Sequence, residues 1–264
     1  MSGAYPDGTI RDRLQSGSTR VVTYVGPLLT VLLGWAVIAH FELIDERTLP
    51  PPTAVWESFV SLTSEGTLTE AIAVTLPRAG AAFAIGVSAG VLVGLTMSQF
   101  RLVEWFFDPI LSTLFPIPKI TLVPVFILWL GPNTTAVVTL AAFEAFFPVA
   151  IATHGGTKSV DRELIWSARA MGLSRLQTAV KVVLPASLPD VLNGAQISLF
   201  LTFAVIVVSE MVLAPSGLGQ ILTESMRSFQ TADAIAVIVV VALFGLLFDG
   251  VFRMLQARFT WWAQ

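Results

Sequence analysis

Long apolar runs dominate this sequence and restrict the folds that it can adopt. A helix that spans the hydrocarbon core of a bilayer needs about 20 predominantly apolar residues. Six runs have this character, at residues 21–42, 71–98, 104–131, 135–154, 192–213 and 233–252. Only 12% of the 264 residues are charged, whereas an average soluble domain has about 25%. The sequence therefore predicts an all-α, polytopic membrane protein with six transmembrane helices.

Prolines interrupt the third run. Pro116, Pro118 and Pro124 lie within it, and a proline inside a helix removes a backbone hydrogen bond and clashes with the preceding turn. We therefore expect this span to be bent or broken near these prolines. The tripeptide at residues 131–133, Gly-Pro-Asn, then predicts a tight turn into the fourth run.

Three glycines recur at every fourth position of the second run, as Gly86, Gly90 and Gly94. Small residues at this spacing lie on one face of a helix and let a neighbouring helix approach closely. That neighbour belongs either to the same bundle or to a second copy of the chain. The spacing alone is compatible with both.

The basic residues predict which helix ends face the cytoplasm. With the amino terminus placed there, eleven Lys and Arg residues fall in cytoplasmic segments, Arg47, Arg78 and Arg227 fall outside, and Lys119 lies within a span. Cytoplasmic segments of membrane proteins carry the excess of Lys and Arg, so both termini are predicted to be cytoplasmic. The loop at residues 43–70 is acidic and is placed outside.

A polar, basic stretch at residues 161–194 stands out within the apolar chain. Its first part predicts a short helix ending at Met171, because Leu164, Ala168 and Met171 fall on one stripe. Gly172 then supplies a residue that can take a positive φ and end the helix. Five of the fifteen Lys and Arg residues lie in or beside this stretch: Lys158, Arg162, Arg169, Arg175 and Lys181.

A second short helix is predicted to follow directly. Ser174 and Gln177 match the capping box that starts a helix, and Pro185 and Pro189 are expected to end it. Two short helices joined by a glycine would protrude from the bilayer and offer a binding surface to another protein. We call this predicted helix pair the knob. An ordinary amphipathic pair of loop helices is the alternative.

Three ionisable residues lie at membrane depth, where charge is costly and therefore indicates function: Lys119, Glu144 and Glu210. We predict that they line a translocation pathway. The alternative is structural pairing, in which Lys119 neutralises Glu144 or Glu210 inside the bundle. Glu210 precedes the stretch at residues 214–219, Ala-Pro-Ser-Gly-Leu-Gly, which is expected to be flexible.

Motifs that indicate catalysis are missing from the sequence. It has no Gly-x-Ser-x-Gly elbow and no His-Glu-x-x-His zinc pair. With zero cysteines, disulfides, thiolate metal sites and a cysteine nucleophile are excluded. Residues 155–159, Gly-Gly-Thr-Lys-Ser, lack the order and glycine spacing of a phosphate-binding loop. We therefore predict no enzyme activity, no metal site and no cofactor, and expect any ATP to be bound by a partner.

The central stretch also has a recognisable spacing. Nine residues separate Gly172 from Val182, which is followed by Val183, Leu184 and Pro185. This resembles the cytoplasmic loop of ABC-importer permeases, in which Glu-Ala-Ala, three residues and Gly precede nine residues and Ile-x-Leu-Pro. Ala168 fills the last alanine position of that pattern. Trp166 and Ser167 stand where it has Glu and Ala.

Further motifs extend this resemblance over roughly residues 49–225. They are Leu-Pro-Pro-Pro-Thr at 49–53, Thr-Leu-Pro-Arg at 75–78, Asp-Pro at 108–109, the proline-rich segment at 115–131, Ser-Glu at 209–210 and Gly-Leu-Gly at 217–219. Together they resemble the permeases for nitrate, aliphatic sulfonates, taurine and pyrimidine vitamin precursors. The resemblance implies a type I ABC importer permease fold, in the inner (plasma) membrane of a prokaryote.

The resemblance also implies partners and a mechanism. Such a permease is usually a homodimer with two ATPase subunits and a substrate-binding protein outside, and it imports a small anion such as nitrate, sulfonate or carboxylate, or a vitamin precursor. ATP closes the ATPase pair, and the knob passes the movement to the spans. Carried over to this sequence, the ATPase-coupling residues are Ala168, Arg169, Met171, Gly172, Leu173 and Ser174.

This interpretation divides the chain into a cytoplasmic tail at residues 1–20, a permease domain at 21–258 with its coupling loop at about 158–190, and a cytoplasmic end at 259–264. A secondary active transporter driven by an ion gradient is the alternative function. Such carriers show interrupted spans in matching positions of two halves, and this sequence has one broken run. A membrane scaffold would not need the three intramembrane charges.

Overall fold

A computed structural model describes residues 26–27 and 29–259. The predicted tail at residues 1–20, the start of the first run and all but Phe259 of the predicted carboxyl end lie outside the described residues. Within these bounds the chain is built of helices without strands. The all-α prediction is therefore confirmed for this part of the chain.

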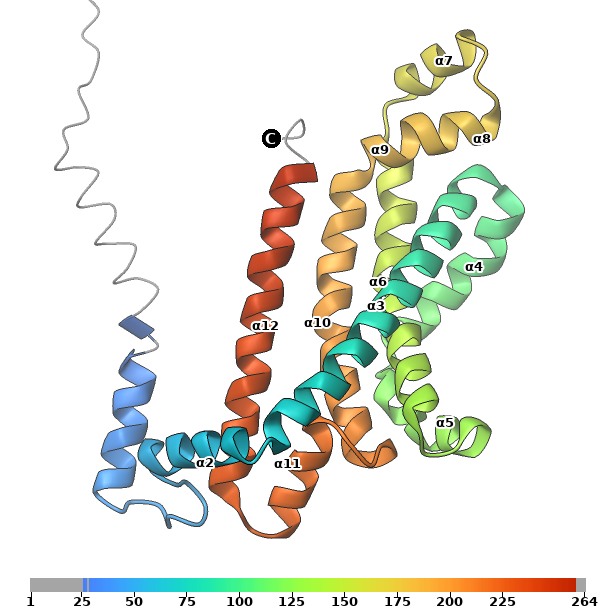
Figure 1. Ribbon diagram of the computed structural model, residues 1–264. Helices are drawn as coiled ribbons and strands as arrows, with labels where there is room; N and C mark the ends of the chain where they lie inside the picture. The colour runs from blue at the N-terminus through green and yellow to red at the C-terminus, as the bar shows by residue number, and fades with distance from the viewer. Residues whose placement is uncertain (1–25, 28, 260–264) are drawn as a thin grey trace, which may run out of the picture.

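Four helices are long and apolar enough to cross a membrane: α3 (Thr67–Gln99), α6 (Thr134–Ser159), α10 (Leu188–Leu213) and α12 (Thr231–Phe259). They correspond to the second, fourth, fifth and sixth predicted runs. A shorter apolar helix at Leu29–His40 lies within the first run. Helices α6, α10 and α12 run side by side along the molecule, and α3 crosses the bundle obliquely (Figure 1).

The third run is broken, as its prolines predict. Helix α4 (Arg101–Leu114) and the segment at Lys119–Leu130, which ends in α5 (Val123–Leu130), are bent by 94° relative to each other. The break contains Pro116 and Pro118. Counted as one bent span, this pair raises the number of candidate spans in the described residues to five.

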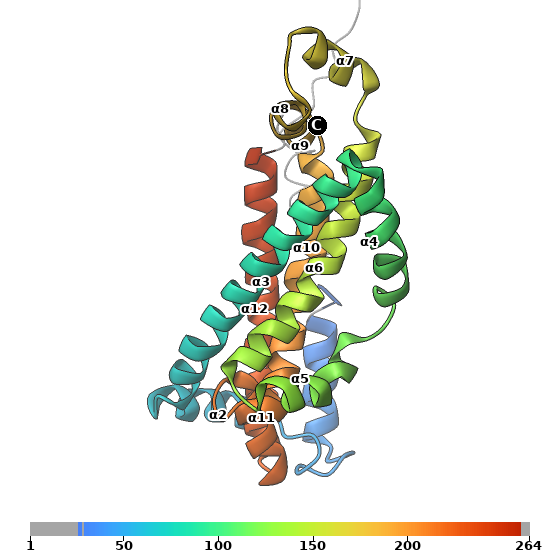
Figure 2. The same cartoon turned by 90° about the vertical axis from the view of Figure 1, so that its right-hand side faces the viewer.

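Helix α6 is the centre of the bundle, between α3 and α10 (Figure 2). A Cβ atom added at Gly86 would lie 2.3 Å from the Cβ of Ala145, and one at Gly94 would lie 2.6 Å from the carbonyl oxygen of Ala150. The glycines of α3 therefore let its backbone touch α6 of the same chain. On the other side of α6, a Cβ at Gly194 of α10 would lie 2.4 Å from that of Ala152.

Two shorter helices lie at the end of the bundle opposite the polar knob (Figure 1). Helix α2 (Pro52–Ser64) occupies much of the segment predicted to be an acidic loop, and it begins with a proline in its first turn. Helix α11 (Leu218–Arg227) follows α10. The expectation of a flexible stretch at residues 214–219 is wrong, because Gly217, Leu218 and Gly219 are buried.

The polar central stretch forms the predicted knob, residues 161–187. Helix α7 (Arg162–Ala170) is capped by the side chain of Asp161, and Gly172 ends the turn with a φ of 85°. Both hydrogen bonds of the Ser174–Gln177 capping box are present at the start of α8 (Arg175–Thr178).

Pro185 does not end the second helix, and that expectation is wrong. A π-helical turn at Ala179–Val183 carries α8 directly into α9 (Leu184–Ala186), with Pro185 inside the first turn of α9. The N–H of Leu184 donates to the carbonyl of Ala179, five residues earlier. Widening the turn in this way lets the helix continue past a residue that has no N–H to donate.

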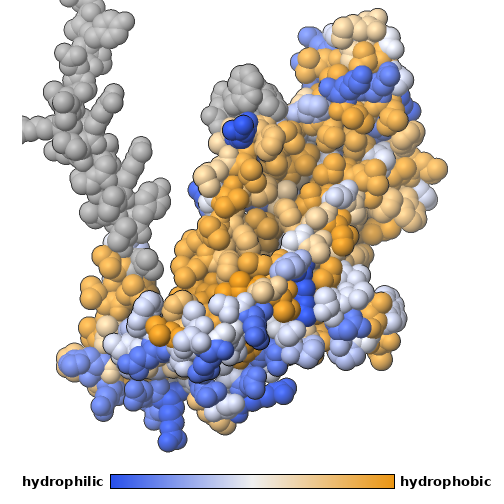
Figure 3. Space-filling view, in the orientation of Figure 1, coloured by the Kyte–Doolittle hydropathy of each residue, from blue (hydrophilic) through white to orange (hydrophobic). Residues whose placement is uncertain are grey.

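Polar and apolar residues are separated along the length of the molecule. Figure 3 shows hydrophobic residues over the long helices, while hydrophilic residues gather at the α2 and α11 end and around the knob. This distribution is the one expected for helices that cross a membrane and have both ends in contact with water.

Candidate coupling and translocation sites

The knob extends beyond the ends of the long helices (Figure 1). It carries exposed apolar side chains. Met171 and Leu176 are each 73% exposed, and Trp166 is exposed as well. Large apolar side chains grouped on a surface that polar residues surround indicate a protein contact. Of the six predicted coupling residues, only Ala168 is buried, where it supports the knob from within.

Gly172 lies at the turn between α7 and α8, in open space. A Cβ atom added there would meet no atom of this chain within 4 Å, although its φ of +85° disfavours other residues. The glycine therefore serves the turn conformation within this chain. The space around it is free for a partner.

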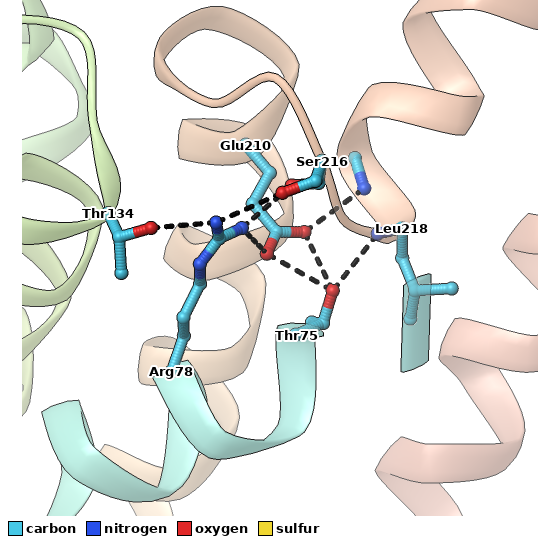
Figure 4. A network of polar contacts seen from close by, with 7 residues as sticks. Thr75, Arg78, Thr134, Glu210, Ser216 and Leu218 are labelled. Atoms are coloured by element: carbon cyan, nitrogen blue, oxygen red, sulfur yellow. Dashed lines mark hydrogen bonds and ion pairs between the residues drawn. The ribbon is translucent and has the colours of Figure 1, made fainter. Parts of the chain in front are cut away.

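At the other end of the bundle, Glu210 is completely buried at 0% exposure. Its carboxylate accepts hydrogen bonds from Arg78 at 2.8 Å, from the Thr75 hydroxyl at 2.9 Å and from the Gly219 N–H at 3.2 Å (Figure 4). Helix α10 thus meets α3 and the start of α11 through one carboxylate. A buried charge is stable only when it is paired and hydrogen-bonded in this way.

Arg78 is bonded on both sides of its guanidinium. Besides Glu210, it donates to the carbonyl of Ser216 at 2.7 Å, to the Ser216 hydroxyl at 3.2 Å and to the Thr134 hydroxyl at 2.8 Å. Thr75 in turn accepts the N–H of Leu218 at 2.9 Å. We call Thr75, Arg78, Thr134, Glu210 and Ser216 the arginine network.

The glycines of the Gly-Leu-Gly motif make room for this network. Gly217 has a φ of 121°, and a Cβ there would lie 2.3 Å from the carboxyl carbon of Glu210. A Cβ at Gly219 would lie 2.1 Å from the carbonyl oxygen of Val207. The motif at residues 75–78 therefore meets the two motifs at residues 209–210 and 217–219, which lie much later in the sequence.

Sequence reasoning missed Arg78, which it counted as an outside residue. That assignment is wrong, because Arg78 is only 7% exposed and paired with Glu210. Its position inside the second apolar run, at residues 71–98, was the signal that could have found it. Glu210 therefore has a buried partner, and that partner is not Lys119.

Lys119 pairs with Glu144 in a separate site. The Lys119 Nζ lies 3.8 Å from the Glu144 Oε1, which is too long for a hydrogen bond. The Nζ donates instead to the carbonyl of Phe115 at 2.8 Å and lies 4.5 Å from the centre of the Phe147 ring. Both members of the pair are buried. The Phe115 ring, with its centre 5.1 Å from the Nζ, is a second aromatic contact, so the ammonium is held by two rings and a carbonyl and makes no hydrogen bond to Glu144.

An open groove of about 350 Å³ lies between α6 and α10, and neither Lys119 nor Glu144 is part of its described wall. Its walls include Pro148, one turn beyond Glu144, and Gly156 and Asp190 near the knob end. Phe115, whose carbonyl binds Lys119, lines it too. Across the described residues, no three His, Asp or Glu side chains gather as a metal site would require.

Comparisons with known proteins agree on one family. The family described as "Binding-protein-dependent transport system inner membrane component" matches residues 86–261. The putative aliphatic sulfonates transport permease protein SsuC of Bacillus subtilis (strain 168) is 31% identical over 252 residues, 95% of this chain and 91% of that protein. The taurine transport system permease protein TauC of Escherichia coli (strain K12) is 31% identical over 250 residues, covering 93% and 91%.

The nitrate import permease protein NrtB of Leptolyngbya laminosa is 26% identical over 238 residues, 86% of this chain and 84% of that protein. Among solved structures, an inward-facing MetNI methionine ABC transporter has a chain with a TM-score of 0.60 and 22% identity, covering 74% of this chain and 94% of its own. A chain of a crystallised amino acid ABC transporter has a TM-score of 0.58 and 18% identity, covering 76% and 98%. These likenesses show a shared fold.

Proposed function

This chain belongs to the family of binding-protein-dependent transport system inner membrane components, and from that membership we propose that two copies of it form the solute pathway of one importer. It is the permease component of an ABC importer in the inner membrane, a transport protein and not an enzyme, and it works with a separate ATPase. The proposed assembly adds two ATPase subunits, which bind the ATP, and a substrate-binding protein on the outer side.

We place the knob and both termini in the cytoplasm. The burial of Arg78 leaves Arg47 and Arg227 as the basic residues of the outer segments, against eleven in the cytoplasmic ones. This excess supports the orientation. The ATPase then docks on the knob through Arg169, Met171, Gly172, Leu173 and Ser174, with Ala168 beneath them. The exposed apolar side chains around the open turn at Gly172 are the observation that carries this proposal.

Gly172→Asp is expected to leave an inserted protein from which the ATPase subunit dissociates. The added side chain meets nothing within the chain, and its positive φ costs about 1–2 kcal/mol, so the fold survives. The same side chain projects into the docking surface and brings a charge to it. The measurement is a pull-down of the detergent-solubilised protein from its native membrane, with mass spectrometry, an ATPase assay and an uptake assay.

Gly66→Asp is the matched control. Gly66 has a φ of +84° and also has no atom within 4 Å of an added Cβ, but it lies before α3, at the end away from the knob. Its variant should retain the ATPase. Full co-purification and uptake by Gly172→Asp would refute the docking surface. A wild-type chain with no ATPase partner that moves solute on an ion gradient would identify a secondary transporter.

We further propose that Lys119 and Glu144 line the solute pathway, reached from the knob side through the groove between α6 and α10. The loose ion pair supports this assignment, because a solute can separate two groups that share no hydrogen bond. For Glu210 the surroundings favour the structural role. Its carboxylate is saturated by the arginine network and reaches no open space.

Cysteine labelling tests this pathway. The chain has no cysteine, so the thiol of a Glu144→Cys variant is unique and should react with a water-soluble thiol reagent in the assembled importer. Solute should slow the reaction. Ser198→Cys is the control, since Ser198 is fully buried against the carbonyl of Ala145. Equal protection of the two thiols in every state of the transport cycle would contradict a pathway at Glu144.

We propose a small sulfonate as the solute class. Two relatives at 31% identity are named for aliphatic sulfonates and for taurine. A buried cation beside two aromatic rings, as at Lys119, supports an organic anion. Uptake of labelled taurine by the reconstituted importer should be competed by alkanesulfonates and not by methionine. Competition by methionine alone would overturn the class.

A further inference from the structure

A small pocket beneath the knob shares only Arg169 with the proposed docking surface and no residue with the proposed pathway. It encloses about 190 Å³ where the ends of α3 and α6 meet α7, α8 and the π turn. Gln99 and Thr157 contribute from the two long helices. Small-molecule sites usually hold about 300–1,000 Å³, so this pocket has room for a compact polar group and not for a whole solute of ordinary size.

Four cationic side chains line the pocket: Lys158, Arg162, Arg169 and Arg175. No carboxylate is part of its described wall. Lys158 forms an ion pair with Glu104, and Arg175 lies 5.3 Å from the centre of the Phe100 ring. Arg162 and Arg169 have no ion pair among the residues that the structure describes. The pocket therefore has an uncompensated positive charge.

The pocket lies at the depth where a lipid headgroup would be found. The two long helices that form its walls end there, at Gln99 and Ser159. Beside it, α4 begins with the exposed apolar residues Leu102, Trp105 and Phe106. Tryptophan is enriched at the interface between membrane and water. Acyl chains could thus lie against α4 while the headgroup enters the pocket.

We propose that this pocket binds the phosphate of an anionic phospholipid from the cytoplasmic leaflet. Arginine guanidinium groups match phosphate oxygens in charge and geometry, and basic pockets between helices on this side of a membrane bind anionic headgroups. A phosphate bound there contacts the knob and the ends of α3 and α6 together. It therefore fastens the knob to the spans, and the assignment to the cytoplasmic leaflet rests on the orientation proposed above.

The test is native mass spectrometry of the full-length chain in detergent, titrated with phosphatidylglycerol or, separately, with phosphatidylcholine. The wild type is expected to bind a first phosphatidylglycerol in preference to phosphatidylcholine. Arg162→Gln should weaken that first binding about fivefold, and Arg162→Gln with Arg175→Gln should weaken it further, because each surface cation contributes about 1 kcal/mol towards an anionic lipid. Arg258→Gln, an exposed arginine at the same end of the molecule outside the pocket, is the matched control.

A second arm separates a lipid from a soluble anion. Inorganic phosphate is added during the titration, and it should displace phosphatidylglycerol weakly because it has no acyl chains to place on α4. If the Arg162 and Arg258 variants weakened the first phosphatidylglycerol binding equally, the pocket would not be the binding site. Tight binding of inorganic phosphate with no preference for phosphatidylglycerol would refute the proposal that the ligand is a phospholipid.

The ATPase pull-down is repeated on the same variants. Lipid binding without an ATPase partner would sustain the lipid site and reject the proposed docking. Co-purification of an ATPase without specific lipid binding would support the proposed docking and reject the lipid site.

Discussion

Glu210→Ala is expected to destabilise the end of the bundle where α3, α10 and α11 meet, because it leaves the Arg78 guanidinium buried without its counter-ion. Breaking a buried ion pair by removing one partner costs about 3–5 kcal/mol, and the Thr75 hydroxyl and the Gly219 N–H lose their acceptor as well. We expect a large drop in the yield of monodisperse protein in detergent and a lower midpoint of thermal unfolding.

Glu224→Ala provides the comparison for Glu210. Glu224 is an exposed carboxylate on α11, at the same end of the molecule, and its loss should change the free energy of unfolding by less than about 0.5 kcal/mol. Replacing Arg78 and Glu210 together by apolar residues should recover part of the loss, because no unpaired charge then remains. If the double variant lost as much free energy of unfolding as the Arg78 and Glu210 single variants together, the two residues would not be energetically coupled.

Gly86→Val is expected to separate α3 from α6. Its Cβ would lie 2.3 Å from the Cβ of Ala145 and 2.6 Å from the carbonyl oxygen of Ala142. Neither can yield without moving the α6 backbone, so the cost should lie at or above the upper end of the roughly 1–3 kcal/mol typical of overpacking. Thermal unfolding in detergent and uptake should both report this loss.

Gly80→Val is the control on the same helix. Gly80 is exposed, and a Cβ there meets nothing within 4 Å. Its variant should insert and remain stable, since valine at this exposed position meets no atom of the chain. Two variants of equal stability would show that the glycines at every fourth position of α3 do not set the distance between the helices.

Features that depend on the local sequence could be predicted. The long apolar runs predicted α3, α6, α10 and α12, and the prolines predicted the break before Lys119, because both features depend only on neighbouring residues. The same holds for the knob, where Gly172 takes its positive φ and the Ser174 capping box forms. Helix α11 was not predicted, and it buries Leu218, Leu222 and Ser225.

Features that depend on long-range contacts could not be predicted. Lys119 had two acidic residues to choose between, and only the fold shows that it lies beside Glu144 while Glu210 meets Arg78. Pro185 was misjudged for another reason. A proline removes one hydrogen bond, but the sequence does not reveal that the preceding turn widens to accommodate the loss.

The arginine network also constrains the order of events during synthesis and folding of the protein. Arg78 and Glu210 are 132 positions apart, and a ribosome adding roughly 5–20 residues per second needs roughly 7–26 s to cover that distance. During this time α3 has been synthesised while the partner of its arginine has not. The nascent chain must keep the guanidinium in contact with water until α10 arrives. Formation of the arginine network is therefore a late event in biogenesis, because it requires the last third of the chain.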